Sequence, residues 1–245
     1  STLSSSSAAS DVYKRQGLVT GVLALVVVFE QVETIRGWDL PATLALLGVY
    51  LTLDALRSLF IGPSLEALVG MDGEIWTGTF DFTLLRPVDA QFLASVRHWR
   101  PFALVDLALG LAVVAAGALQ LGRELAPLHV ATFLLTLFVA VTILYATLLA
   151  FSALALWSPG FLFTWVFDGL FRMARYPVGL YPGWLRLVLT WIVPVGVMTT
   201  VPAQALSGSL PTATLLGSVA LAVVLLVAAS ALFRVGLRHY ASASS

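Results

Sequence analysis

Residues 127–157 read PLHVATFLLTLFVAVTILYATLLAFSALALW and contain no aspartate, glutamate, lysine or arginine. An α-helix needs about 20 apolar residues to cross the hydrocarbon core of a bilayer, and this run exceeds that length. Charged and polar side chains cover the surface of a soluble domain, and this run supplies almost none. The stretch therefore predicts a membrane-spanning helix that is long enough to tilt.

The rest of the chain has the same character. It is 59% hydrophobic and 11% charged, with a mean hydropathy of +0.96, whereas soluble domains carry about 25% charged residues. Residues 187–233 lack charged side chains altogether. Further apolar segments lie at 17–29, 40–62, 100–122, 184–206 and 212–233. The chain is thus predicted to be an all-α polytopic membrane protein with six transmembrane helices.

The first sixteen residues, STLSSSSAASDVYKRQ, differ in composition from the remainder of the chain. Lys14 is the only lysine of the chain, and the serine tract lacks the pattern of a signal peptide. We expect residues 1–16 to be a non-native leader, similar to a translated adapter remnant; the alternative is an ordinary serine-rich tail. We expect residues 17–240 to form a single transmembrane domain and residues 241–245 a cytoplasmic tail.

One long polar connection, residues 63–99, joins the second and third predicted spans. Its apolar residues alternate with charged ones, which is typical of short amphipathic helices on a membrane face or against a partner. Glycines and Pro87 punctuate it. Arginines gather beside it (Arg57, Arg86, Arg97, Arg100) and after the last span (Arg234, Arg238), whereas Arg36 and Arg123 fall in other loops. Because positive loops stay in the cytoplasm, both termini are predicted to be cytoplasmic.

Several catalytic classes have no support in the sequence. There is no cysteine, and the three histidines are scattered, which argues against thiolate chemistry and a metal site. Walker, GxSxG and HExxH motifs are missing from the sequence. An intramembrane enzyme would need a paired nucleophile and base. We therefore expect a non-catalytic protein with no metal and no cofactor of its own.

Charged residues inside apolar segments are candidates for a functional site, because they are costly in lipid. Asp54 and Arg57 lie at i, i+3 in the second span. They either form an ion pair on one helix face or lie beside a transport path. Asp168, Arg172 and Arg175 follow at i, i+4, i+7, so one helix face carries all three. That face is predicted to point into protein.

Two segments resemble a known family. GEIWTGTFDFTLLRPVDAQF (73–92) resembles a cytoplasmic segment of the type-2 ABC exporter permeases. RYPVGLYPGWLRLVLTWIVPVGVMTTVPAQALSG (175–208) is similar to the late segment of the same family. The resemblance covers residues 17–245 and is closest to six-span bacterial permeases. It implies a permease subunit in the bacterial inner membrane that transports by efflux; the alternative is a secondary transporter or channel that works without an ATPase.

The resemblance also implies partners and a coupling segment. Two permease chains, identical or different, would form the path, and two cytoplasmic ATPase subunits would hold ATP and Mg. The ATPase would push on residues 66–87 as on a coupling helix; without a partner this segment would be a solvated loop. An apolar face of Leu65, Leu68, Val69, Ile75 and Trp76 would dock on the ATPase. The implied coupling residues are Glu66, Leu68, Glu74, Ile75, Gly78, Asp81, Arg86 and Pro87.

Residues 158–208 allow two interpretations. By resemblance, 158–177 is the fifth span and 183–206 is an outer re-entrant hairpin bent near Pro194, before helix 6. By arginine counting, 187–206 is the fifth span. The order of Pro182, Trp184, Pro194 and Pro202 favours the hairpin. Such a hairpin is tolerated only where protein covers its backbone.

Overall fold

The computed structural model describes residues 22–23, 25–27, 29–35, 37–121, 126–158 and 163–240. The leader 1–16, the tail 241–245 and much of the predicted first span, 17–29, lie outside these residues. Apart from an isolated bridge between Ile35 and Trp38, the described elements are all helical. They are α2 (Leu40–Leu56), the π-helix η1 (Arg57–Ile61), α3 (Gly62–Glu66), α4 (Glu74–Thr77), α5 (Asp81–Leu84), α6 (Ala90–Val96), α7 (Ala103–Gln120), α8 (Pro127–Leu154), α9 (Phe163–Met173), the 3₁₀ turn η2 (Val178–Leu180), α10 (Gly183–Leu187), the π-helix η3 (Val188–Ile192), α11 (Val195–Leu206) and α12 (Thr212–His239).

Within the described residues, 4 helices are long and apolar enough to cross a membrane. They are α7, α8, α12 and the continuous rod Leu40–Glu66, which α2, η1 and α3 form together. A fifth candidate is a pair bent by 86°, Gly183–Ile192 and Val195–Leu206, which we call the bent pair. The α9 helix has 11 residues, or about 16 Å of length against a hydrocarbon core of about 30 Å. The total of six crossings stays a prediction.

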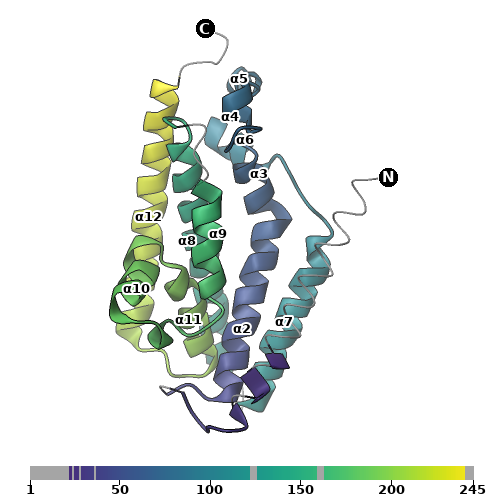
Figure 1. Cartoon of the computed structure of the whole chain (residues 1–245), viewed down its shortest axis with the longest axis vertical. Coiled ribbons are helices and arrows are strands. Elements are labelled where there is room, and N and C mark those ends of the chain that lie inside the picture. Colours follow the sequence, from purple (N-terminus) through teal and green to yellow (C-terminus); the bar gives the residue numbers. More distant parts are fainter. Residues whose placement is uncertain are drawn as a thin grey trace.

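The long helices run along the long axis of the molecule (Figure 1). The rod packs against α7, and α8 packs against α12. Between these two layers, α11 lies against both α8 and α2. The short helices α4, α5 and α6 gather at the same end as the C-terminus, and α10 and α11 lie toward the other end (Figure 1). We call residues 67–99, which contain α4 to α6, the cap.

Glycine determines how closely the rod approaches α7. A Cβ atom added to Gly110 would lie 2.7 Å from the Thr52 amide nitrogen, and one added to Gly117 would lie 2.6 Å from that of Ala45. On the rod itself, a Cβ added to Gly48 would lie 2.5 Å from the amide nitrogen of Val114 of α7. In lipid, where the hydrophobic effect does not drive helices together, such close backbone contact is a main source of association.

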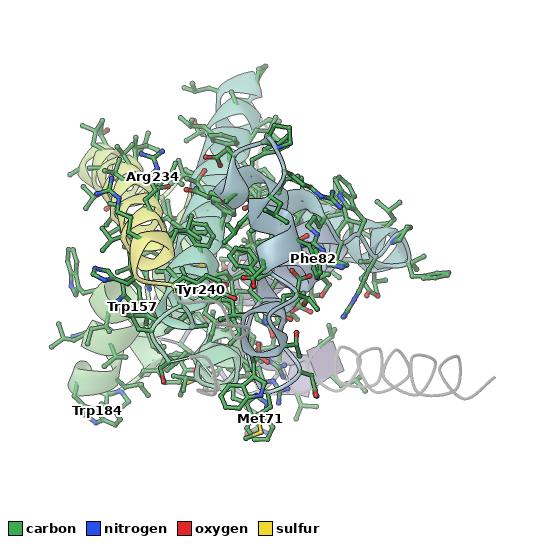
Figure 2. All side chains as sticks on the ribbon, turned by 90° about the horizontal axis from the view of Figure 1, so that it is seen from above. Met71, Phe82, Trp157, Trp184, Arg234 and Tyr240 are labelled. Carbon is green, nitrogen blue, oxygen red and sulfur yellow. The ribbon has the colours of Figure 1, made fainter. Side chains whose placement is uncertain are left out.

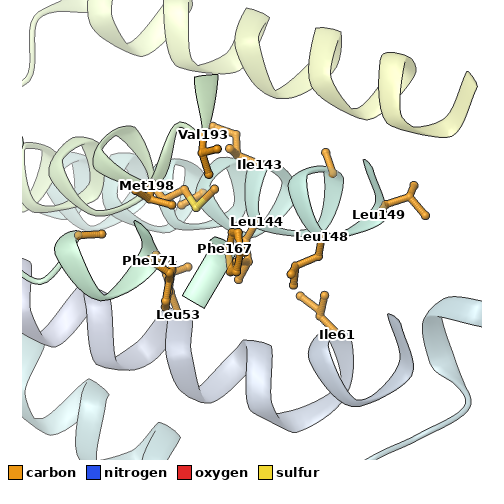
Figure 3. Packing of buried hydrophobic residues seen from close by; sticks show 14 of the residues in the cluster. Leu53, Ile61, Ile143, Leu144, Leu148, Leu149, Phe167, Phe171, Val193 and Met198 are labelled. Atoms are coloured by element: carbon orange, nitrogen blue, oxygen red, sulfur yellow. The ribbon is translucent and has the colours of Figure 1, made fainter. Parts of the chain in front are cut away.

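Large side chains fill the space between the rod, α8, α9 and α11 (Figure 3). Phe167 and Phe171 of α9 are fully buried, and their rings stack with centroids 5.5 Å apart. They meet Leu53 and Ile61 of the rod, Leu144 and Leu148 of α8, and Met198 of α11 in the same cluster. One face of the short helix α9 is thereby held against the bundle.

Two prolines interrupt the helical hydrogen bonding, with different results. Pro63 has no N–H, so it cannot bond the carbonyl of Leu59; the Arg100 N–H donates to that oxygen instead, at 2.8 Å. Gly62 keeps right-handed helical angles before Pro63, and the rod continues through the π-turn. Val193, before Pro194, is extended at φ −124°, and the chain bends there. The bend lies near Pro194 as expected, whereas the re-entrant hairpin itself stays a prediction.

We expect Gly110→Val to lower the stability of the fold, because its branched side chain has no room against the rod. Overpacking typically costs about 1–3 kcal/mol. Thermal unfolding of the purified chain in detergent measures the loss. Gly217→Val on α12 is the matched control, since a Cβ there meets nothing within 4 Å. Equal melting temperatures for the two variants would contradict the close contact.

Candidate functional site

A cavity of about 500 Å³ lies between the rod and α9. This volume is in the range of small-molecule sites, about 300–1,000 Å³. The rod contributes Leu47, Tyr50, Leu51, Asp54, Arg57, Ser58, Gly62, Pro63 and Glu66, and the segment around α9 contributes Asp168, Phe171, Arg172, Arg175 and Tyr176; Leu25 and Arg100 complete the lining. The structure thus brings together the five charged residues predicted to lie in apolar segments, Asp54, Arg57, Asp168, Arg172 and Arg175.

Arg57 is the centre of the charged lining. Its side chain is largely buried, and it forms ion pairs with Glu66 and, at 2.6 Å, with Asp168 Oδ1. Its Nε also donates to Glu66 Oε1 at 3.2 Å. The guanidinium lies over the ring of Phe167, 4.9 Å from its centroid. Arg57 therefore joins two parts of the rod to α9, and its removal would leave both carboxylates without their shared cation.

The π-turn helps to place this group. Arg57 opens η1, where the Gly62 N–H bonds back to the Arg57 carbonyl over five residues. Glu66 follows at the end of α3, on the same rod. π-turns within α-helices occur frequently at functional sites. The pairing of Arg57 with Glu66 depends on this local geometry, and sequence spacing alone does not indicate it.

A second arginine stacks on an aromatic ring deeper in the cavity. The guanidinium of Arg175 lies 5.6 Å from the centroid of the Tyr50 ring. Tyr50 in turn packs against Phe171, with centroids 5.2 Å apart. Arg175 Nε is buried and has no hydrogen-bond partner among the described residues. Stacking on the ring therefore holds this cation in place without satisfying all of its donors.

The cap buries part of the apolar face that was expected to dock on a partner. Leu65, Leu68 and Ile75 are 0%, 1% and 2% exposed and belong to the core. They do not form a docking face, because short helices in a compact cap turn these side chains toward the bundle. Trp76, which was expected on that face, is 53% exposed, and further exposed apolar side chains of the cap include Phe82 at 70%, Leu85 at 80% and Val88 at 48%. Figure 2 looks onto this end and shows Phe82 and Met71 at its surface.

Two of the predicted coupling carboxylates are engaged within the chain. Glu66 pairs with Arg57, and Glu74 accepts a hydrogen bond from Arg97 at 2.8 Å. Arg97 also donates to Thr83, so it ties α4, α5 and α6 together. Gly78 ends α4 with φ +73°, which is the turn expected at this position. Arg86 and Pro87 are exposed on the segment that follows α5.

The end of α12 also touches the cap. The ring of Tyr240 lies edge-on to that of Phe80 in the cap, with centroids 5.8 Å apart. Burial, and then the nearby charge of Asp81, raises the pKa of Tyr240 to about 12. Asp81, another predicted coupling residue, therefore faces the last helix of the bundle.

Sequence reasoning missed a polar network that anchors α6. Gln91 Nε2 donates to the hydroxyl of Tyr145 on α8 at 3.2 Å and to that of Ser230 on α12 at 3.0 Å. Ser95 and Tyr145 share a further hydrogen bond of 2.8 Å. The only sequence signal was the presence of a tyrosine and a serine in otherwise apolar spans, which is common. This network connects the cap to two long helices.

The four residues predicted to mark the hairpin lie on the bent pair or directly beside its helices. Pro182 precedes α10, Trp184 is exposed on it, and Pro194 stands at the bend before α11. Pro202 lies inside α11 and is buried. Since α11 packs against α8 and α2, protein covers much of its surface.

A family model described as ABC-2 family transporter protein matches residues 17–244 of the chain. The chain matches no curated protein and no solved structure at a significant level.

We expect Arg57→Met to destabilise the chain, because it leaves Glu66 and Asp168 without their shared cation. Breaking a buried pair from one side typically costs about 3–5 kcal/mol, and the partial exposure of Asp168 reduces this value. The melting temperature in detergent should fall by several degrees. Adding Glu66→Gln and Asp168→Asn should recover much of the loss. The control is Arg186→Met on the exposed surface of α10; an equal loss there would contradict a specific role for Arg57.

Proposed function

Because the chain belongs to the ABC-2 transporter family, we propose that it is the membrane-spanning permease subunit of an ATP-driven exporter. ATP binding and hydrolysis then take place on separate cytoplasmic ATPase subunits. A second permease chain, identical or different, completes the path. In this proposal the cap and both termini lie in the cytoplasm of a bacterial cell, and the bent pair lies at the outer face.

The exposed apolar side chains of the cap carry this proposal. Phe82 and Leu85 are 70% and 80% exposed, at an end of the bundle that also carries charged residues. Apolar anchors surrounded by polar groups are typical of protein–protein contacts. They supply the docking face, whereas Leu68 and Ile75 support it from below.

Force from the ATPase can reach the bundle by two routes. One is the rod, which continues from the cap end through η1 into α2 and carries Arg57. The other is Gln91, which contacts α8 and α12 by direct hydrogen bonds. A movement of the cap therefore shifts three long helices together, and the cavity between the rod and α9 changes with them.

The bent pair is proposed to be the re-entrant hairpin. It turns by 86° at Pro194. Its α10 and η3 part exposes Trp184 and Trp191, which suits a membrane interface. The α11 part is buried against α8 and α2, as irregular backbone at membrane depth requires. In this arrangement α9 is the remainder of a fifth crossing.

Leu85→Asp in the cap should prevent docking of the ATPase, because it places a charge in an apolar contact. The tagged chain is captured from detergent-solubilised membranes of its source, and co-captured proteins are identified by mass spectrometry. Capture of the wild-type chain should recover an ABC ATPase, and the captured sample should hydrolyse ATP. The variant should lose both by about tenfold or more, the effect of a central contact residue.

The control is Ser209→Asp, which adds the same charge to an exposed turn after α11. Membrane levels of all three chains are compared by immunoblot, so that a folding defect is recognised. Equal capture with Leu85→Asp would remove this surface from the mechanism. Transport by the purified wild-type chain without any ATPase would contradict the permease proposal and favour a secondary transporter or channel.

A further inference from the structure

The inner part of the cavity lies at membrane depth. At a rise of about 1.5 Å per residue, Tyr50 lies about 15 Å along the rod from Leu40 and about 24 Å from Glu66. The hydrocarbon core is about 30 Å thick, so a rod that spans the bilayer places Tyr50, and the Arg175 side chain stacked on it, at the depth of the apolar core. A guanidinium at this depth is costly unless an anion compensates it.

The charges of the lining divide into two groups. Near the cap, Arg57 forms ion pairs with Glu66 and Asp168, so two carboxylates share one cation. Deeper in the cavity, Arg172 and Arg175 face the space, and Asp54 is the other charged residue of the rod there. Counted over the whole lining, the four arginines Arg57, Arg100, Arg172 and Arg175 face the three carboxylates of Asp54, Glu66 and Asp168, so one positive charge is left.

Arg175 also has a donor to spare. Its Nε is buried and has no hydrogen-bond partner among the described residues. Leaving a buried donor of a charged group unpaired costs more than the net gain of an ordinary hydrogen bond. The Tyr50 ring holds the guanidinium beside the cavity, so the cation is fixed in position before any ligand enters.

The remaining lining includes an apolar wall. Leu25, Leu47 and Leu51 line the cavity together with the Phe171 ring. An aliphatic chain can lie along these side chains at a depth where lipid tails are also found. The site thus offers a cation and an apolar wall side by side.

We propose that this cavity binds an anionic amphiphile, with its headgroup at Arg172 and Arg175 and its tail along Leu47 and Leu51. The headgroup is a phosphate, carboxylate or sulfonate that accepts hydrogen bonds from the two guanidinium groups. The inference deepens the proposed function and rests on it only for the role of the amphiphile as transported cargo.

The experiment uses the purified chain alone, in micelles of a neutral maltoside detergent, with probes that differ in one part. Dodecyl phosphate and dodecyltrimethylammonium share a tail and carry opposite charges, and inorganic phosphate has the headgroup without the tail. Binding is measured by isothermal titration and by the shift in melting temperature. Dodecyl phosphate should bind and raise the melting temperature, whereas the ammonium probe and inorganic phosphate should bind at least about tenfold more weakly.

Arg175→Gln and Arg172→Gln should each weaken binding of dodecyl phosphate by about tenfold, the effect of losing one charge-assisted contact. Arg186→Gln on α10, outside the cavity, should bind as wild type does. Gel filtration confirms that each variant is folded, and Arg172 is exposed enough for its substitution to spare the core. Equal binding of the anionic and the cationic probe would overturn the proposal, and so would unchanged binding of dodecyl phosphate in both arginine variants. Inorganic phosphate that binds as tightly as dodecyl phosphate would also overturn it.

A second arm separates cargo from a resident lipid. Dodecyl phosphate is added to the complex captured with its ATPase, and ATP hydrolysis is measured. If dodecyl phosphate stimulates ATP hydrolysis in wild type but not in Arg175→Gln, the amphiphile is transported cargo. If it binds without stimulating hydrolysis, the amphiphile is a lipid that the chain retains. Both results keep the anionic amphiphile as the ligand. Because the first arm contains no ATPase, failure of the site leaves the permease proposal intact, and absence of an ATPase leaves the binding result intact.

Discussion

The charge of Arg57 is the constraint on which the polar interior of this bundle depends. A guanidinium within a membrane-spanning rod is tolerated only when its charge is compensated, and here Glu66 and Asp168 supply the compensation. One carboxylate comes from the same rod and the other from α9, so the ion group holds α9 against α2. The charged cavity exists because this contact fixes one of its walls. Phe167 and Phe171 shield the group and exclude lipid from it.

The backbone obeys a similar constraint, and it joins the rod to its neighbouring spans near the cap. The carbonyl that Pro63 leaves free is satisfied by the amide of Arg100, at the start of the next long helix. The carbonyl of Leu65 accepts a hydrogen bond from Ser152 of α8 at 3.1 Å. The cap itself is joined to α8 and α12 by the hydrogen bonds from Gln91 to Tyr145 and Ser230. A cap attached in this way can transmit movement, which a solvated loop could not do.

Features that depend on local chemistry could be predicted from the sequence. Long apolar runs indicated the spans, Gly78 indicated a turn, and Pro194 indicated the bend. The spacing of Asp168 and Arg172 placed both on one face. Features that depend on tertiary contacts could not be predicted. The alternation in the cap showed that Leu68 and Ile75 face something apolar, but the same pattern fits a partner and the chain's own core. The partners of Arg57 depend on a π-turn and on a helix more than a hundred residues away, and neither leaves a periodic signal.

The proposed arrangement places the cap and the turn after α11 on opposite sides of the membrane. Because the chain contains no cysteine, single cysteines at Thr77 and Ser209, both exposed, can report the two sides. A maleimide that does not cross membranes is added to intact cells, and then to permeabilised cells. Ser209→Cys should be labelled in intact cells, and Thr77→Cys only after permeabilisation. Labelling of Thr77→Cys in intact cells would place the cap outside, away from ATP, and would contradict the proposed mechanism.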